Sequence, residues 1–286
     1  MAWLNSTSWY KGNPNYMTFE EAAAVTSEQF SGTNNAQKGA IVTFDEAQYF
    51  TSVTYLSPTA FQKCTLLERI TLPNTLTEIR GFTWEGAGAF FNCSSLVTVD
   101  MPDGVRTIGR RAFYNCTSLA LTSLPSGVTS IDSSAFHACT HLTLTSLPSG
   151  ITSIGPSAFS GCTALALTSL PSGITSIEQN TFGGCTALAL TSLPSGITTI
   201  GYQAFQSCLA LKDTLYEIPS SVMDLGDRAF RYVEFPRLKF LGLTPPTFGT
   251  QSIYNPKGID CQVPSASLTE YQEAMQGLLY ITISTY

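Results

Sequence analysis

The sequence contains little charge and few of the residue types that do catalysis. Only 12% of its 286 residues are charged, 14 basic residues stand against 20 acidic ones, and there are two histidines. A formal net charge of -6 lacks the basic surface that a phosphate backbone requires, so nucleic acid is not expected as a partner. With 43% apolar residues the chain is too hydrophobic for disorder, and a folded protein is expected.

Long apolar runs and targeting features are missing as well. Ser, Thr, Pro or Gly interrupts every apolar stretch before it reaches the roughly 20 residues that span a bilayer, so no membrane-spanning segment is expected. The first 16 residues have no basic segment followed by an apolar one. We therefore expect no secretory signal peptide at this start.

A repeat dominates what the sequence does contain. From 93 to 208 a cysteine recurs every 23 residues, three residues after a phenylalanine. A proline then follows, with apolar residues three and six positions later. One unit shows these positions as Phe113, Cys116, Pro125, Val128 and Ile131. Because so short a unit cannot enclose its own apolar side, the units must stack, and the sequence predicts a repeat solenoid of about eight 23-residue units.

Three segments are expected along the chain. The solenoid occupies residues 44–235, between an N-terminal capping segment, 1–43, and a C-terminal capping segment, 236–286, because an open stack needs its end faces covered. The front segment contains a helix pattern that begins at Thr18, and the back one contains a helix pattern that Ser267 is placed to cap.

The period, the Leu/Ile spacing and the AFxxC turn resemble the BspA-like leucine-rich repeat family of bacterial surface proteins. The resemblance covers about two thirds of the chain. It implies a leucine-rich repeat fold with a short strand just before each proline, a parallel sheet on the concave face, and turns or short helices on the convex side. It also implies an extracellular or cell-surface location and non-enzymatic adhesion to a protein or glycan on a host or neighbouring cell.

The central units depart from strand alternation. Ile70 and Leu72 alternate as strand residues do, whereas Leu121 and Leu124 are three positions apart. The same spacing of three is assigned to the five units that end at Pro125, Pro148, Pro171, Pro194 and Pro219. A bulge or a looser strand would accommodate it, so the register there stays open.

In either register, the residue before the last apolar one faces away from the core. These outward residues are the first candidates for ligand contact: Thr71, Asp100, Ser123, Ser146, Ser169 and Ser192, with Glu217 in the last unit. Hydroxyl groups in such a row could bind a glycan or a protein backbone. The alternative is that they are only solvated strand residues.

An insertion supplies the second candidate region. Six extra residues separate Ile79 from Phe90, and they place Phe82 and Trp84 among glycines. Insertions in a solenoid form loops on one face and often carry contacts. The alternative is that both aromatic side chains fold back onto the convex surface.

The cysteines are expected to form a buried ladder of free thiols. Seven of the eight occupy one position in successive units, beside an inward phenylalanine, where a small apolar thiol packs well. A disulfide framework, typical of an even count in a secreted chain, is the alternative.

The sequence shows no convincing catalytic or metal centre. His137, Cys139 and His141 resemble a metal cluster, but Cys139 belongs to the inward ladder, and the histidines are interpreted as solvated turn residues. No nucleophile stands near a plausible base, so no enzyme, no metal and no cofactor is expected. Two functions stay open: a surface-displayed binding module, or a structural spacer or self-assembling repeat without a ligand of its own.

Overall fold

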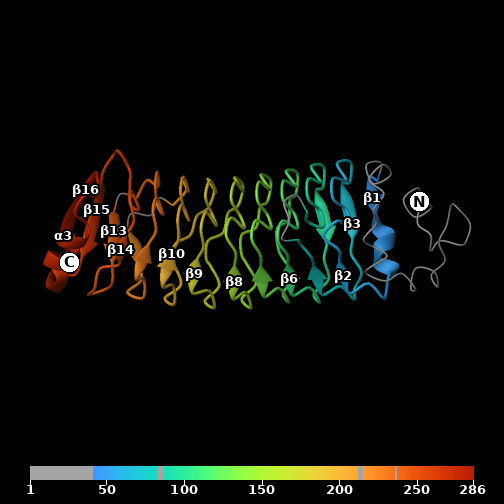
Figure 1. Cartoon of the computed structure of the whole chain (residues 1–286), viewed down its shortest axis with the longest axis horizontal. Coiled ribbons are helices and arrows are strands. Elements are labelled where there is room, and N and C mark those ends of the chain that lie inside the picture. Colours follow the sequence, from blue (N-terminus) through green and yellow to red (C-terminus); the bar gives the residue numbers. More distant parts are fainter. Residues whose placement is uncertain (1–40, 83–86, 212–214, 236) are drawn as a thin grey trace, which may run out of the picture.

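The chain folds into a row of stacked coils. The structure is a computed structural model that describes residues 41–82, 87–211, 215–235 and 237–286. Figure 1 shows the coils side by side along one axis, in sequence order from blue to red. Within the described residues no helix has the length and apolar character needed to cross a membrane.

A ladder of short parallel strands runs along one side of the array from residue 55 to residue 248, and we call it the long ladder. It forms a five-stranded sheet, β2-β4-β6-β7-β8, and a four-stranded sheet, β9-β10-β12-β14. In most of these strands a Ser or Thr faces outward and the next residue, usually isoleucine, faces the core. The strands are β2 (Tyr55–Leu56), β4 (Glu78–Ile79), β6 (Thr107–Ile108), β7 (Ser130–Ile131), β8 (Ser153–Ile154), β9 (Ser176–Ile177), β10 (Thr199–Ile200), β12 (Asp224–Leu225) and β14 (Thr247–Phe248).

A second ladder, which we call the interrupted ladder, includes the strands that precede Pro73, Pro102 and Pro219. It is present only near the two ends of the array, as the sheets β1-β3-β5 and β11-β13-β15-β16. Its strands are β1 (Thr43–Phe44), β3 (Arg69–Thr71), β5 (Thr98–Asp100), β11 (Tyr216–Ile218), β13 (Arg237–Phe240), β15 (Ile259–Val263) and β16 (Ile281–Thr285).

The expected strand before each proline is therefore wrong for the four central units. Leu121 and Leu124 are both buried, and two inward residues three positions apart cannot alternate as strand residues do. Adjacent coils keep only scattered backbone bonds there, such as Ala166 N to Leu144 O at 3.1 Å. The sheet that continues through the middle lies instead after the prolines, in the long ladder.

The unit that ends at Pro219 needs a further correction. Its inward residues are Tyr216 and Ile218, two positions apart, and they lie on the regular strand β11. Leu215, which the sequence pattern placed inside, is 37% exposed.

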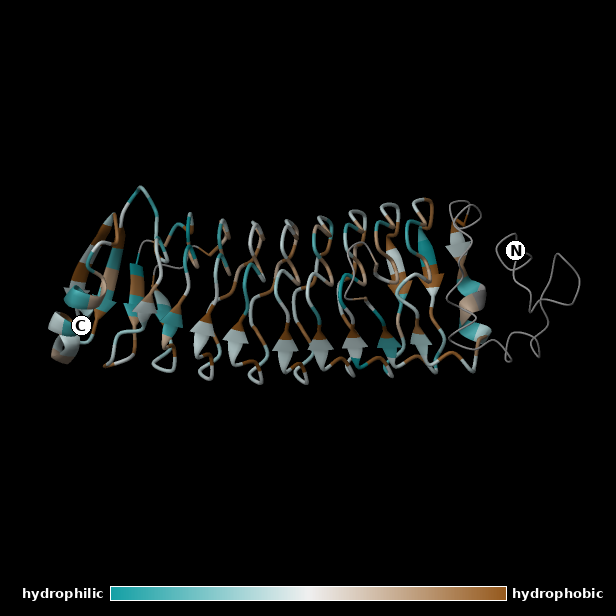
Figure 2. Cartoon of the chain, viewed as in Figure 1, coloured by the Kyte–Doolittle hydropathy of each residue, from teal (hydrophilic) through white to brown (hydrophobic). Residues whose placement is uncertain are grey.

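The core is a continuous column of aromatic rings and thiols. From Phe61 to Phe230, the ring centroids of successive coils are 5.0 to 5.7 Å apart and the rings are nearly parallel. The cysteines are buried and free, which confirms the thiol ladder. From Cys93 to Cys208 their Sγ atoms donate to phenylalanine carbonyls, as Cys139 does to Phe113 at 3.0 Å. Figure 2 shows the matching hydrophobic segments, in brown, repeated from coil to coil.

Helix is scarce among the described residues, and turns form the side opposite the strands. The helical segments are η3 (Asp45–Tyr49), η4 (Ser265–Ser267) and α3 (Leu268–Ala274). Helix α3 confirms the helix expected in the C-terminal segment, although the Ser267 side chain makes no capping hydrogen bond. The helix expected from Thr18 lies outside the described residues.

The coils continue past residue 235. Strand β14 extends the long ladder, and Ile253 stands 23 residues after Phe230 in the same buried position. The boundaries proposed for the three segments stay predictions.

Glycines allow the coils to pack closely, which gives a test of the stacking. A Cβ at Gly226 would lie 2.7 Å from backbone atoms of Gly201 and Tyr202 in the preceding coil, whereas a Cβ at Gly196 would meet nothing within 4 Å. Gly226→Ala is expected to lower the free energy of unfolding by about 1–3 kcal/mol. Gly196→Ala is expected to raise it by up to about 1 kcal/mol. Urea unfolding of both variants measures the difference, and equal effects would contradict the close packing.

Candidate functional site

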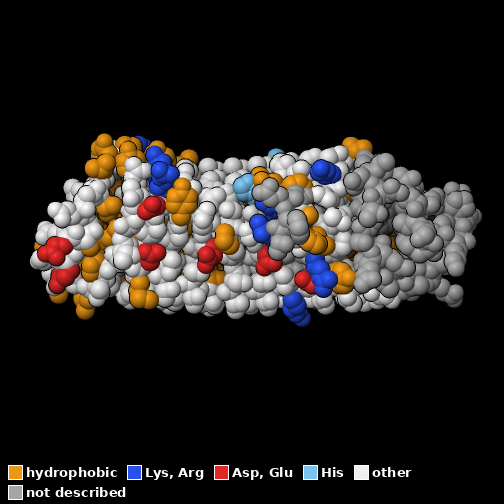
Figure 3. Space-filling model, in the orientation of Figure 1, with side chains coloured by type: hydrophobic (Ala, Val, Ile, Leu, Met, Phe, Trp, Pro, Cys, Tyr) orange, Lys and Arg blue, Asp and Glu red, His pale blue; other side chains and the backbone are white. Residues whose placement is uncertain are grey.

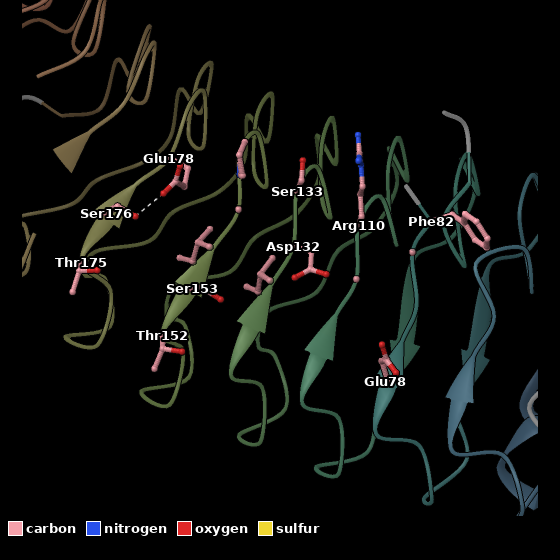
Figure 4. A pocket seen from close by; sticks show the side chains of 16 residues that line it. Glu78, Phe82, Arg110, Asp132, Ser133, Thr152, Ser153, Thr175, Ser176 and Glu178 are labelled. Atoms are coloured by element: carbon pink, nitrogen blue, oxygen red, sulfur yellow. Dashed lines mark hydrogen bonds between the residues drawn. The ribbon is translucent and has the colours of Figure 1, made fainter. Parts of the chain in front are cut away.

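A groove of about 700 Å³ crosses the outer face of the long ladder. It extends from the coil of β4 to the coil of β9, and Figure 4 shows its side chains supplied by successive coils. Phe82 and Arg110 lie at one end, Asp132 lies in the middle and Glu178 lies at the other end. Since neighbouring strands are about 4.8 Å apart, the three coil steps from Arg110 to Glu178 span about 14 Å.

The end of the groove at Glu178 lies where the long ladder opens. At the next step along the array, the Gly201 amide donates to the Ile177 carbonyl at 2.8 Å. No such bond joins the Glu178 amide to the Ile154 carbonyl in the described part of the chain, and β8 and β9 belong to separate sheets. The same two coils stay joined on the turn side, where the Ser157 amide donates across at 2.8 Å. The opening is therefore local to the strand face.

Free hydroxyl groups line the middle of the groove. Elsewhere on this face threonine hydroxyls form hydrogen bonds to the neighbouring coil, as when Thr129 Oγ1 donates to the Arg106 carbonyl at 3.2 Å. Four hydroxyl groups in the groove make no hydrogen bond within the described residues, and they belong to Ser133, Thr152, Ser153 and Thr175. These groups are available to a ligand as both donors and acceptors.

The charged side chains of the groove are mainly acceptors. Burial raises the pKa of the Asp132 carboxyl, and the nearby Glu78 carboxylate raises it further. Glu178 accepts a hydrogen bond from Ser176 at 2.6 Å and has a second oxygen free of that bond. Arg110 lines the end of the groove near Phe82 and provides its positive charge. Its Nε is buried without a hydrogen-bond partner in the described chain. Figure 3 shows a face on which charged side chains are few and separated by neutral surface.

The insertion places one of its two aromatic residues at the groove. An isolated antiparallel bridge joins Gly81 to Gly88 at the base of the loop. A side chain at Gly81 would overlap the Arg110 backbone, so only glycine allows the loop to lie against this coil. Phe82 is 47% exposed and lines the groove, while Trp84 lies outside the described residues.

The other predicted contact residues lie on the side of the interrupted ladder and do not line the groove. Asp100 and Ser123 share a hollow of about 430 Å³ beside β5. The Thr71 hydroxyl lies 3.2 Å from carboxylate oxygens of both Asp45 and Asp100, so it is already engaged. The remaining candidates are exposed on coils without a strand at this position: Ser146, Ser169 and Ser192.

The two histidines occupy different environments. His141 is exposed, with Nδ1 2.7 Å from the Thr117 carbonyl. His137 is half-buried, because its ring stacks on Tyr114 at 4.6 Å, so the solvated-turn interpretation is wrong for this residue. Burial and the nearby Arg111 lower the pKa of His137. Among the described residues no three His, Cys, Asp or Glu side chains are grouped to hold a metal ion.

Sequence reasoning missed most of the groove, although a signal for it was present. Thr-Ser-Ile recurs at 129–131, 152–154 and 175–177, and its isoleucine always stands six residues after the proline. Its outward serine and inward β-branched residue fit a strand. The opening between β8 and β9 has no comparable signal, since it consists of missing backbone hydrogen bonds.

Comparisons with known proteins agree with this architecture. The family model for the BspA type leucine rich repeat region matches residues 30–166, 106–237 and 164–272. A leucine-rich repeat protein from Bacteroides ovatus has 27% sequence identity and a TM-score of 0.58, over 82% of this chain and 65% of that one. The Treponema pallidum leucine-rich repeat protein TpLRR has 31% identity and a TM-score of 0.44, over 53% of this chain and 66% of that one.

A leucine-rich cell surface protein from Faecalibacterium prausnitzii has 22% identity and a TM-score of 0.35, over 82% of this chain and 77% of that one. No curated protein matches the chain. The chain spans 65% of the length of the Bacteroides ovatus protein. The family model matches most of this chain, from residue 30 to residue 272. The chain belongs to the BspA-type leucine-rich repeat family.

Proposed function

We propose that this chain is a non-enzymatic binding module, displayed at the cell surface, that adheres to a protein or glycan on a host or neighbouring cell through the groove of the long ladder. The observation that carries the proposal is the groove itself. It combines free hydroxyl groups, carboxylates and an exposed aromatic ring in one depression. Binding sites are typically concave surfaces with a few convergent polar groups.

Family membership supports the proposed class and location. The matched family is a leucine-rich repeat family, and the Faecalibacterium prausnitzii neighbour is described as a cell surface protein. Repeat arrays present extended surfaces on which side chains from several units act together. Hydroxyl groups, carboxylates and one aromatic ring across five coils are such a surface.

The experiment compares two tryptophan substitutions in one coil. Ser153 lines the groove and Ser146 is exposed on the side of the interrupted ladder, so Ser153→Trp fills the groove while Ser146→Trp adds the same side chain elsewhere. Both sites are exposed, and stability should change by no more than about 0.5 kcal/mol. Binding to a panel of immobilised matrix proteins and glycans near physiological salt is expected to weaken at least about tenfold in Ser153→Trp alone.

Two results would contradict the proposal. Equal binding by the wild type and Ser153→Trp would show that ligands do not use the groove. Failure of the wild type to bind any probe would favour the alternative function, a structural spacer, whose near-identical coils need no ligand.

A further inference from the structure

The residue types that line the groove suit a sugar ligand better than a protein ligand. The centres of protein interfaces are enriched in aromatic residues, Met and Arg, and depleted of Ser, Asp and Glu. Here serines, threonines and three acidic residues predominate, and Phe82 is the sole aromatic side chain in the lining. A polyhydroxylated ligand can pair with such groups, whereas an apolar protein surface would leave them desolvated and unpaired.

The free groups complement sugar hydroxyls in both directions. Asp132 and Glu178 offer carboxylate oxygens, which accept hydrogen bonds, and the hydroxyls of Thr152 and Ser153 either donate or accept. Arg110 adds a donor group, since its side chain also lines the groove. The acidic groups also repel an anionic ligand, so the charge balance favours a neutral sugar over a uronic acid or a sulfated one.

The geometry of the array favours a linear ligand that lies along its axis. Equivalent side chains recur with the strand spacing of about 4.8 Å. Linked pyranose rings in an extended chain advance by a similar distance per ring. At the β8–β9 opening, the Glu178 amide and the Ile154 carbonyl are not bonded to each other and add a backbone donor and acceptor. The exposed ring of Phe82 offers an apolar face to the C–H groups of a terminal pyranose.

We infer that the groove holds a neutral, linear oligosaccharide that lies across the coils of β6 to β9 with about one pyranose ring per coil. The inference rests on the proposed function and names the ligand class of the same groove. Asp132 and Glu178 accept from ring hydroxyls, the free Ser and Thr hydroxyls orient the middle rings, and Phe82 stacks on the ring at the β4 end.

The test is a length series measured by isothermal titration calorimetry with the whole chain. The probes are di- to hexasaccharides of β-1,4-linked glucose, β-1,4-linked N-acetylglucosamine, β-1,3-linked glucose and α-1,4-linked glucose. For at least one linkage, affinity is expected to rise about tenfold or more from dimer to tetramer, and to change less than about twofold beyond it. Asp132→Asn and Phe82→Ala should each weaken the tetramer about fivefold or more, with Ser146→Ala unchanged.

The outcomes separate this inference from the broader proposal. If no oligosaccharide binds, while deglycosylated matrix proteins bind the wild type and not Ser153→Trp, the sugar inference is overturned and the groove remains a protein-binding site. Sugar affinity that ignores chain length, or that survives Asp132→Asn and Phe82→Ala, overturns the inference as well. If every probe binds Ser153→Trp as tightly as it binds the wild type, both the sugar inference and the proposed function are overturned.

Discussion

Phe159→Ala is expected to lower the free energy of unfolding by about 3–5 kcal/mol, the range for removal of a fully buried aromatic side chain. The Phe159 ring is buried between those of Phe136 and Phe182, with centroids 5.5 and 5.7 Å away. Its loss leaves a cavity between two rings that the backbone hydrogen bonds of adjacent coils hold apart. Each coil contacts only its neighbours, so the damage should be local before it becomes global.

Urea unfolding together with hydrogen exchange checks this prediction. Amides of the coils of β7 to β9 should lose protection first, and those near β14 last. Phe82→Ala is the matched control, because it removes the same atoms from a half-exposed site and should cost at most about 0.5 kcal/mol. A loss below about 1 kcal/mol in Phe159→Ala would contradict the continuous aromatic column.

Mild alkali is expected to destabilise the protein strongly. Burial raises the pKa of five successive ladder thiols: Cys116, Cys139, Cys162, Cys185 and Cys208. In the unfolded chain these thiols ionise near their ordinary pKa of about 8.5. Above that pH the unfolded state binds fewer protons than the folded state. The contribution of the buried thiols to the free energy of unfolding is therefore fully present below about pH 8.5 and falls as the pH rises. From about pH 8 to about pH 9.5, each thiol should remove about 1.2 kcal/mol, or about 6 kcal/mol for the five.

Urea unfolding at the two pH values, with a reductant present, measures the effect. Cys139→Ala removes one titrating group, so its loss of stability over the same pH interval should be smaller by about 1.2 kcal/mol. The quantity compared is the change in the free energy of unfolding between the two pH values, and not the absolute stability of the variant. A free energy of unfolding that is unchanged between the two pH values would contradict the free-thiol ladder, since cysteines paired in disulfides do not titrate.

The core was predictable from the sequence because it repeats there. Phe113 and Cys116 recur with a fixed period, and a period of that length has few packing solutions besides a stack. In the unit that ends at Pro219 the inward residue was assigned wrongly, because a leucine matched the pattern without matching the geometry. Leu215 was placed inside because it occupies a leucine position, yet Tyr216 offers a larger apolar ring on the strand face that alternates with Ile218.

The candidate site was predictable only in part. Phe82 could be found, because an insertion into a strict repeat is visible in the sequence and exposed in the structure. The groove beside it depends on which of two ladders continues, and on the separation of β8 from β9. Ser153 and Ser146 lie in equally polar stretches of the sequence, so composition alone does not distinguish the groove from the side of the interrupted ladder.

Hydrogen exchange at the β8–β9 opening tests the central claim most directly, that the groove is the binding site. In the free protein, the amides of Thr175 and Glu178 lack ladder hydrogen bonds and should exchange quickly, whereas the bonded amide of Gly201 should exchange slowly. With the tightest-binding probe at saturation, protection is expected to rise at residues 152–178 and to stay unchanged at residues 120–124. Protection that appears only at 120–124, or nowhere, would contradict the assignment of the groove as the binding site.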